Sequence, residues 1–299
     1  MKRGYLQILL AAVLFLLALG LTLYPVVSNW YIGRHQSRIQ TEYREVLEQT
    51  DSAEIESIRE SAAAYNKTIT PGAAEKAYSQ ESIRLAAEDY VNRVDVSGSG
   101  IMGYVEIPKI GADLPIYHGT GADSLDRGTG HLLGSSLPVG GESTHTIITG
   151  HSGMASQKMF TDLEQLREGD IFYLHVLDET LTYEVREIHT VLPHDTTYLG
   201  IEPGEDLCTL VTCTPTGVNT HRLLVHGSRI PYVPTEETEA SAVLHEENTD
   251  SNWEKQYWLG VRLGLAAMVF LTLVAGAVLY IRRNRGRAVH RKGGRYVRK

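Results

Sequence analysis

The sequence has little cysteine and, over its central part, little positive charge. Only two of its 299 residues are cysteines, which excludes a small scaffold held together by disulfides. Residues 28–257 contain 16 basic and 36 acidic residues, a net charge of −20, and so acidic a body argues against a nucleic-acid partner. No internal repeat is visible. Hydrophobic residues make up 42% of the chain and charged residues 21%, which excludes wholesale disorder and allows a packed core.

Two stretches lack charge over a length that can span a bilayer. Residues 5–27 have no charged side chain, and we interpret residues 1–27 as an N-terminal transmembrane helix or uncleaved signal anchor. A cleaved signal peptide is the alternative. Residues 257–281 are the second predicted transmembrane helix. It is uncharged from Leu263 onward and begins with Tyr257 and Trp258, which suit a membrane interface.

The basic residues at the two ends predict the topology. Lys2 and Arg3 precede the first apolar stretch, and nine Lys or Arg and no acidic residue follow Ile281 in the basic tail, residues 282–299. Segments rich in Lys and Arg that flank a transmembrane helix stay in the cytoplasm. We therefore predict a multi-pass protein of the cell membrane with both termini cytoplasmic and residues 28–256 on the extracellular face.

Composition divides this body into three parts. Residues 28–100 are predicted to be a helical extension, with helices over residues 34–65 and 80–91. Residues 101–230 change to short apolar segments separated by turns, which suggests an antiparallel barrel. Residues 231–256 form an acidic linker that we expect to be disordered. The predicted strands are 102–107, 145–149, 171–177, 180–186, 188–192, 207–212 and 222–230, with a short helix at 157–166.

The two cysteines are predicted to have different roles. They are five residues apart in one predicted strand, which separates their Cα atoms by about 16 Å and points their side chains to opposite faces. That distance is too long for a disulfide. Cys208 lies in an apolar run and is expected to be a buried core thiol. Cys213 ends the strand beside a loop, where reactive side chains are usually displayed.

Hairpin spacing places an arginine beside Cys213. A symmetric register centred between Gly217 and Val218 pairs position 213 with Arg222. Directly paired side chains have Cβ atoms about 5 Å apart. A guanidinium cannot act as a base, but it lowers the pKa of a neighbouring thiol and binds negative charge that develops on a carbonyl oxygen.

A cysteine nucleophile also requires a histidine, and the chain has 12. His151 follows an apolar strand and lies between Gly150 and Gly153, which allow another segment to approach closely. It is the first candidate, and His131 is the alternative. A metal site is the other use of such residues, but the possible ligands lack the Cys-x-x-Cys spacing of structural zinc sites, and we expect no metal and no cofactor. Those possible ligands are Cys208, Cys213, His221 and His226.

Three motifs, in this order, resemble the sortase family. Residues 103–110 resemble its opening strand, residues 149–153 its histidine motif, and residues 209–215 with 219–225 its active-site hairpin. The match covers about residues 101–230. The resemblance implies an eight-stranded sortase-type β-barrel. The two-helix topology, the long N-terminal extension and the Cys-Thr-Pro sequence are similar to class C, the pilin-polymerising sortases of Gram-positive bacteria.

The resemblance implies a membrane-anchored cysteine transpeptidase. Such an enzyme cleaves an LPXTG-like sorting signal between Thr and Gly through a thioacyl intermediate, and its partners are LPXTG-bearing surface or pilin proteins. It implies Cys213 as nucleophile, His151 as acid and base, and Arg222 as the group that holds the substrate and stabilises the oxyanion. Thr212 and Thr214 are predicted to add polar contacts to the substrate.

The identity of the acceptor amine is left open by the resemblance. A pilin lysine is expected, with a peptidoglycan cross-bridge amine as the alternative. A hydrolytic cysteine protease and a non-catalytic membrane-tethered peptide-binding module are the rival interpretations.

One motif of class C sortases is missing. Members of this class commonly carry a lid over the active site, anchored by an Asp-Pro-aromatic motif, and this sequence contains no Asp-Pro. Residues 66–80, with Pro71 and with Tyr78 as a plug, are nevertheless a candidate lid. A plain connection between two helices is the alternative.

Overall fold

The computed structural model describes residues 2–69, 90–154, 157–232 and 252–293. The chain forms two compact units, which we describe separately. One consists of residues 1–27 and 254–299, and the other is residues 28–253.

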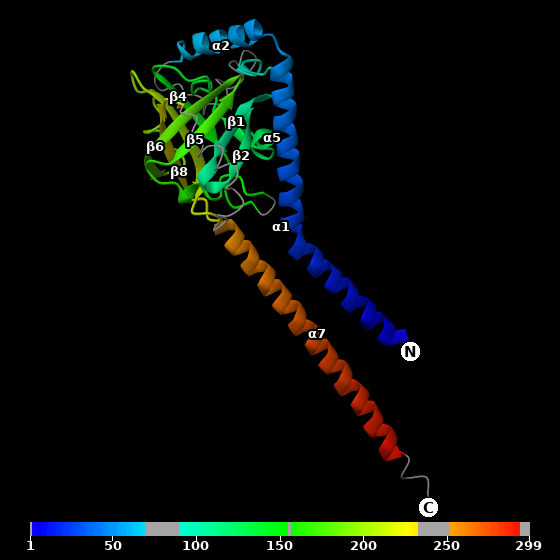
Figure 1. The fold of residues 1–299 in the computed structure, drawn as a ribbon. Coiled ribbons are helices and arrows are strands. Elements are labelled where there is room, and N and C mark those ends of the chain that lie inside the picture. The colour runs from blue at the N-terminus through cyan, green and yellow to red at the C-terminus, as the bar shows by residue number, and fades with distance from the viewer. Residues whose placement is uncertain (1, 70–89, 155–156, 233–251, 294–299) are drawn as a thin grey trace, which may run out of the picture. The chain divides into compact units, whose positions relative to one another are not determined.

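The second unit contains a closed barrel of eight strands (Figure 1). Their order around the barrel is β1-β2-β3-β4-β7-β8-β6-β5, which confirms the predicted eight-stranded fold. The expectation of a wholly antiparallel barrel is wrong, because β2 pairs with β3 and β4 with β7 in parallel. The strands are β1 (Ile101–Ile107), β2 (Ala112–His118), β3 (Thr129–His131), β4 (Thr144–Thr149), β5 (Ile171–Val176), β6 (Glu179–Val191), β7 (Asp206–Thr214) and β8 (His221–Ile230).

Several predicted boundaries are corrected by the structure. The segments 180–186 and 188–192 belong to one strand, β6, whose pairing with β8 shifts register between Val185 and Glu187. The predicted helix at 157–166 is reduced to the 3₁₀ turn η2 (Leu163–Gln165). β2 and β3 were not predicted. Two further short elements are η1 (Pro108–Ile110) and α5 (Ala122–Leu125).

The barrel interior is filled by alternate side chains of the strands. Ile148, Leu210 and Val225 are fully buried there, together with Cys208. Cys208 is a free cysteine, as predicted, and its burial raises the pKa of its thiol well above the usual range. Side chains at odd positions of β7 therefore lie on the outer face of the barrel, because successive residues of a strand point to opposite sides.

The N-terminal extension contains two helices where one was predicted. α1 (Lys2–Gln49) ends just before Asp51, whose carboxylate caps α2 (Ser52–Asn66) by accepting from the Ala53 N–H at 2.7 Å. The predicted single helix over 34–65 is thus broken at this cap. Of the predicted helix over residues 80–91, all but the last two residues lie outside the described residues.

Both helices attach to the barrel through buried polar contacts. The Tyr43 hydroxyl of α1 donates to the Met102 carbonyl at 3.2 Å and accepts from the Leu177 N–H at 2.9 Å. At the end of α2, the Asn66 amide bonds both backbone groups of Leu137, at 3.1 and 2.7 Å. Figure 1 shows α2 lying across one end of the barrel.

One helix among the described residues is long and apolar enough to cross a membrane. It is Trp258–Val278, within α7 (Asn252–Gly293), and it coincides with the second predicted span. The first predicted span falls within α1 and stays a prediction. The predicted acidic linker lies mostly outside the described residues.

Candidate active site

Cys213 lies near the end of β7, between the ends of two neighbouring strands. On one side the antiparallel register pairs it directly with Arg222 of β8, as the hairpin spacing predicts. On the other side, Thr149 of β4 pairs in parallel with Val211, and the Gly150 N–H continues this ladder by donating to the Val211 carbonyl at 3.0 Å. Extending the register by two residues places His151 beside Cys213. Residues from three strand ends therefore converge at one point.

Cys213 and Arg222 share the outer face of the barrel. Val211 and Leu224, two residues from Cys213 and Arg222 along their strands, belong to an outer apolar cluster. Because every second residue of a strand shares a face, Cys213 and Arg222 continue this surface at its edge, and His151 follows the end of β4 next to them. All three are partly exposed. We name the cluster the outer apolar row; it consists of Leu132, Ile147, Val191, Leu199, Val211 and Leu224.

The loop that carries His151 is fixed from two sides. A Cβ at Gly150 would lie 2.7 Å from the ring of Phe160, whose N–H donates to the His151 carbonyl at 3.0 Å. The Ser152 hydroxyl donates to the Cys213 carbonyl at 2.6 Å. Gly153 has a φ of +73°, and a Cβ there would lie 2.9 Å from the Thr216 methyl group. The close approach that the glycines predict is therefore present on both sides of the histidine.

Thr212 and Thr214 make contacts within the protein. Thr212 is 1% exposed, and its hydroxyl donates to the Gly150 carbonyl at 2.7 Å. The Thr214 hydroxyl donates to Glu164 at 3.0 Å. Their contact with substrate stays a prediction. What the geometry does show is that Thr212 supports the residue before His151.

Removal of the Thr212 hydroxyl tests this support. We expect Thr212→Val to lower kcat about 5- to 10-fold, because loss of one buried hydrogen bond, about 1 kcal/mol, frees the His151 loop. Thr182→Val is the matched control, since the buried Thr182 hydroxyl has no hydrogen-bond partner in the part of the chain that the structure describes. Steady-state kinetics of both variants would settle the point, and equal losses would contradict it.

Ser152, Phe160 and Glu164 were not predicted from the sequence. Ser152 stands beside His151 in Gly-His-Ser-Gly, so proximity in the sequence was a usable signal. No pattern in the sequence identifies Phe160 and Glu164 as part of the site, because their positions depend on the path of the loop after β4.

His131, the alternative histidine, has a structural role. It is fully buried, with Nδ1 2.8 Å from the Tyr90 hydroxyl and Nε2 2.8 Å from the Ser136 carbonyl. A carbonyl only accepts, so Nε2 carries the proton and Nδ1 accepts from Tyr90. Burial lowers the pKa of His131 to about 4. Both ring nitrogens are thus occupied inside the protein, which leaves His151 as the candidate base.

The burial of His131 predicts that the folded protein loses stability in acid. The pKa of His131 is about 4 in the folded protein and about 6.5 when unfolded, so the unfolded chain binds a proton that the folded chain excludes between these values. Stability is fully present above pH 6.5 and falls as the pH drops toward 4. We expect His131 alone to contribute a loss of about 2–3 kcal/mol between pH 7 and 4.5. Urea unfolding of wild type and His131→Gln at both pH values measures it. A fall of the same size in both proteins would contradict this assignment.

The other predicted candidates do not converge. Cys208 points into the barrel while His226 lies on the outer face, so the four possible zinc ligands do not share a site. Pro71 and Tyr78, the candidate lid residues, lie outside the described residues.

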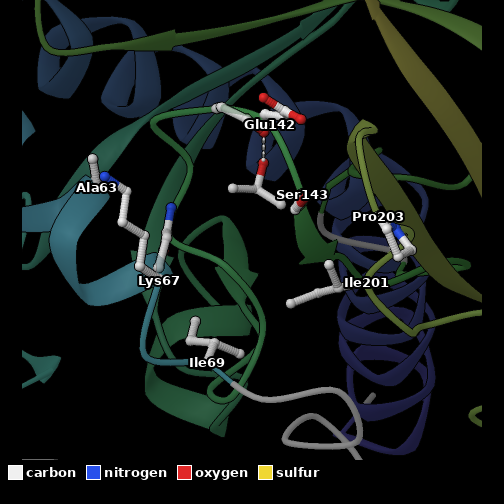
Figure 2. Close-up of a pocket in the computed structure, with 11 residues that line it drawn as sticks. Ala63, Lys67, Ile69, Glu142, Ser143, Ile201 and Pro203 are labelled. Atoms are coloured by element: carbon white, nitrogen blue, oxygen red, sulfur yellow. Dashed lines mark hydrogen bonds between the residues drawn. The ribbon is translucent and has the colours of Figure 1, made fainter.

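A separate cavity of about 600 Å³ lies at the opposite end of β4. Figure 2 shows Ala63, Lys67 and Ile69 on one wall and Ile201 and Pro203 on the other. It reaches Thr144 at the start of β4, whereas the His151 loop follows the end of that strand. At about 3.3 Å per residue, the cavity is roughly 20 Å from the cysteine site.

Comparison with known proteins gives consistent matches. A family model described as the sortase domain matches residues 105–230. "Sortase A" of Streptococcus agalactiae serotype III is 27% identical over 227 residues, which are 75% of this chain and 84% of that protein.

Two solved structures have higher identity. Sortase C of Streptococcus pneumoniae is 44% identical with a TM-score of 0.60, and the match covers 66% of this chain and 100% of that one. Sortase C1 of Streptococcus agalactiae is 43% identical with a TM-score of 0.59 and the same coverage. The residues that the family model matches include His151, Cys213 and Arg222.

Proposed function

This chain belongs to the sortase family of cysteine transpeptidases, and from that premise we propose that it polymerises pilins. The proposed reaction cleaves an LPXTG-like sorting signal between Thr and Gly and transfers the threonine carbonyl to a pilin lysine. The observation that carries the proposal is the position of Cys213 between Arg222 and the His151 loop.

The proposed chemistry assigns one task to each of the three residues. The Cys213 thiolate attacks the threonine carbonyl carbon, and the Arg222 guanidinium donates to the oxygen that becomes negative. His151 protonates the glycine nitrogen as the C–N bond breaks, which leaves a thioester on Cys213. The acceptor amine then gives a proton to His151 and attacks the thioester. A new amide forms and the thiolate is regenerated.

The surface beside Cys213 supports a substrate with apolar residues before the threonine. The outer apolar row continues from Cys213 and Arg222 through Val211 and Leu224. The members of this row are at most 9% exposed, so the leucine and proline of a sorting signal would pack on its edge, and each CH₂ group that they bury contributes about 0.8 kcal/mol.

We propose a pilin lysine as the acceptor because of the similarity to the two sortase C structures. Both sortase C structures match at more than 40% identity over their full length, and the study of the S. pneumoniae enzyme concerns pilin substrate specificity. We propose the same acceptor class for this chain. A peptidoglycan cross-bridge amine is the other acceptor that the test must distinguish.

The proposed location is the extracellular face of the cell membrane. The helix Trp258–Val278 can cross a bilayer, and the basic residues after Ile281 favour a cytoplasmic C-terminus. Lys2 and Arg3 favour the same side for the N-terminus. Secreted substrates that are still held in the membrane would then meet the catalytic unit.

Intact mass spectrometry tests the proposal. The full chain in detergent is incubated with an LPXTG peptide, with and without a pilin fragment that bears a lysine. We expect an acyl adduct on Cys213, none on the buried Cys208, and transfer of the acyl group to the lysine. An adduct that moves only to a cross-bridge amine would indicate wall anchoring, and one released only by water would indicate a protease. No adduct with any sorting peptide would contradict the proposal.

A further inference from the structure

A line of hydrogen bonds crosses three strands on the same outer face as Cys213. The Thr209 hydroxyl of β7 lies 2.6 Å from His145 Nε2 of β4 and 2.7 Å from His226 Nδ1 of β8. His145 Nδ1 lies 2.7 Å from the Gly200 carbonyl. These three side chains are at most 4% exposed. We name them the histidine–threonine chain.

The direction of each bond follows from its fixed end. The Gly200 carbonyl only accepts, so His145 Nδ1 carries a proton and His145 Nε2 accepts from the Thr209 hydroxyl. The Thr209 oxygen then accepts from His226 Nδ1. His226 Nε2 is left as a buried acceptor without a hydrogen-bond partner among the described residues. The protons thus all point one way, toward Gly200.

Gly200 belongs to the segment that connects β6 to β7, residues 192–205. The neighbouring Leu199 is 8% exposed and packs with Ile147, Val211 and Leu224 in the outer apolar row. Tyr198 stacks on the His189 ring with their centroids 3.9 Å apart. The bond from His145 therefore holds the backbone at Gly200. The preceding residue, Leu199, packs in the apolar row beside Cys213.

A polar chain at this place is not needed to fill space. The chain is flanked by the outer apolar row and by the His189 and Tyr198 rings, and apolar side chains in its place would avoid the cost of the buried, unpartnered His226 Nε2. Among the described residues, the one hydrogen bond from the chain to a group outside the barrel strands is the bond to Gly200, and the His226 ring also lies 6.1 Å from the Tyr198 ring of the same segment. The bond therefore adds to the contacts that fix the 192–205 segment, among them the ion pair of Glu202 with Arg186 and the bond from the Gly204 N–H to the Ser143 hydroxyl.

We propose that His145, Thr209 and His226 are positioning residues, whose hydrogen-bonded chain holds Gly200 and thereby sets Leu199 against the surface that receives the sorting signal. This inference rests on the proposed function for the nature of the ligand. The tether itself does not depend on that function and can be measured without substrate.

Two substitutions of His145 separate its two bonds. The asparagine amide nitrogen replaces Nδ1, so His145→Asn retains the bond to Gly200 and loses the one to Thr209. The glutamine carboxamide reaches the position of Nε2, where its oxygen accepts from the Thr209 hydroxyl, so His145→Gln retains the contact with Thr209 and loses the bond to Gly200. In the full chain in detergent, we expect His145→Gln to raise KM for an LPXTG peptide about 10-fold with kcat within 2-fold. His145→Asn is expected to raise KM by no more than about 3-fold.

Thr209 provides a second, independent variant. Thr209→Val removes the central hydroxyl and is expected to raise KM about 5-fold, and Thr209→Ser restores the hydroxyl and the wild-type KM. Thr146→Val is the matched control, because its buried hydroxyl donates to the Ser136 carbonyl at 3.0 Å on the inner side of β4. If Thr146→Val raises KM as much as Thr209→Val, or if His145→Asn and His145→Gln have equal KM values, the proposal is overturned.

Hydrogen exchange without peptide measures the tether directly. We expect faster exchange of amides in residues 192–205 for His145→Gln and Thr209→Val, and wild-type rates for Thr209→Ser and Thr146→Val. Unchanged exchange in His145→Gln would overturn the proposal even if KM changed. If the wild type cleaves no sorting peptide, the proposed function fails, and the exchange rates still decide whether the chain holds the segment. Should Thr209→Val not fold, the pair of His145 variants gives the same decision.

Discussion

Cys213→Ala is expected to lower transpeptidation by more than about 10⁴-fold, while Cys208→Ala leaves kcat within 2-fold of wild type. Removal of Cys213 removes the atom that forms the thioester, and no other thiol can substitute for it. Cys208 is fully buried on the inner side of the barrel, and its pKa is raised well above the usual range by that burial. The two substitutions delete the same atom from the same strand, five residues apart.

The two variants are also expected to differ in stability. Cys208→Ala leaves a small cavity in the core and should lower the free energy of unfolding by about 1 kcal/mol. Cys213→Ala removes a partly exposed side chain and should lower it less. Product formation by chromatography, together with urea unfolding of each variant, separates loss of chemistry from loss of fold.

Alkylation of the wild type with iodoacetamide gives an independent control. Label is expected on Cys213 and not on Cys208 in the folded protein, because only Cys213 is accessible to the reagent. Retention of more than about 1% of wild-type activity by Cys213→Ala would place the nucleophile elsewhere. A comparable loss in Cys208→Ala would mean that the fold, rather than the thiol, limits the rate.

The part of the site that depends on local pairing could be predicted from the sequence. Cys213 and Arg222 belong to strands joined by one short loop, so the spacing of the hairpin alone defines their register. His151 was placed only by its context at the end of a strand. Its position beside Cys213 depends on the parallel pairing of β4 with β7, between residues about 60 positions apart in the sequence. No local pattern encodes that pairing.

The elements that the sequence analysis does not predict also have physical explanations. β2 contains Pro115, which lowers the strand propensity of its sequence, and β3 has only three residues. The break between α1 and α2 does have a signal in the sequence, because Asp51 followed by Glu54 is an N-cap pattern. The histidine–threonine chain joins β4, β7 and β8, and its three residues come together only when the order of strands around the barrel is known.

Arg222→Lys is expected to lower kcat/KM about 10²- to 10³-fold, the cost of removing one donor to a developing oxyanion. Arg222 Nη1 lies 3.1 Å from the His221 carbonyl, which orients the guanidinium by the backbone of its own hairpin. Nε and Nη2 then carry the donors that can reach a substrate oxygen. A lysine ammonium is a compact charge without this planar fork, so it cannot bond the hairpin carbonyl and the oxyanion in the same geometry.

The control for this substitution lies on the same strand. Arg229 of β8 is 3.9 Å from Asp206 near the other end of β7, and Arg229→Lys is expected to leave kcat/KM within 2-fold. Because lysine retains the positive charge, alkylation of Cys213 by iodoacetamide should change less than 2-fold in Arg222→Lys. Acylation of Cys213 by the sorting peptide should fall in Arg222→Lys by the same factor as kcat/KM, about 10²- to 10³-fold.

The contrast between the two reactions distinguishes two roles for Arg222. Alkylation needs only the thiolate, whereas acylation also develops negative charge on a carbonyl oxygen. If both rates fall together, Arg222 acts mainly by stabilising the thiolate, and the oxyanion would have to be held by other donors. If neither rate falls, the pairing of Cys213 with Arg222 is a structural feature of the hairpin. A fall in acylation alone would assign the guanidinium to the transition state.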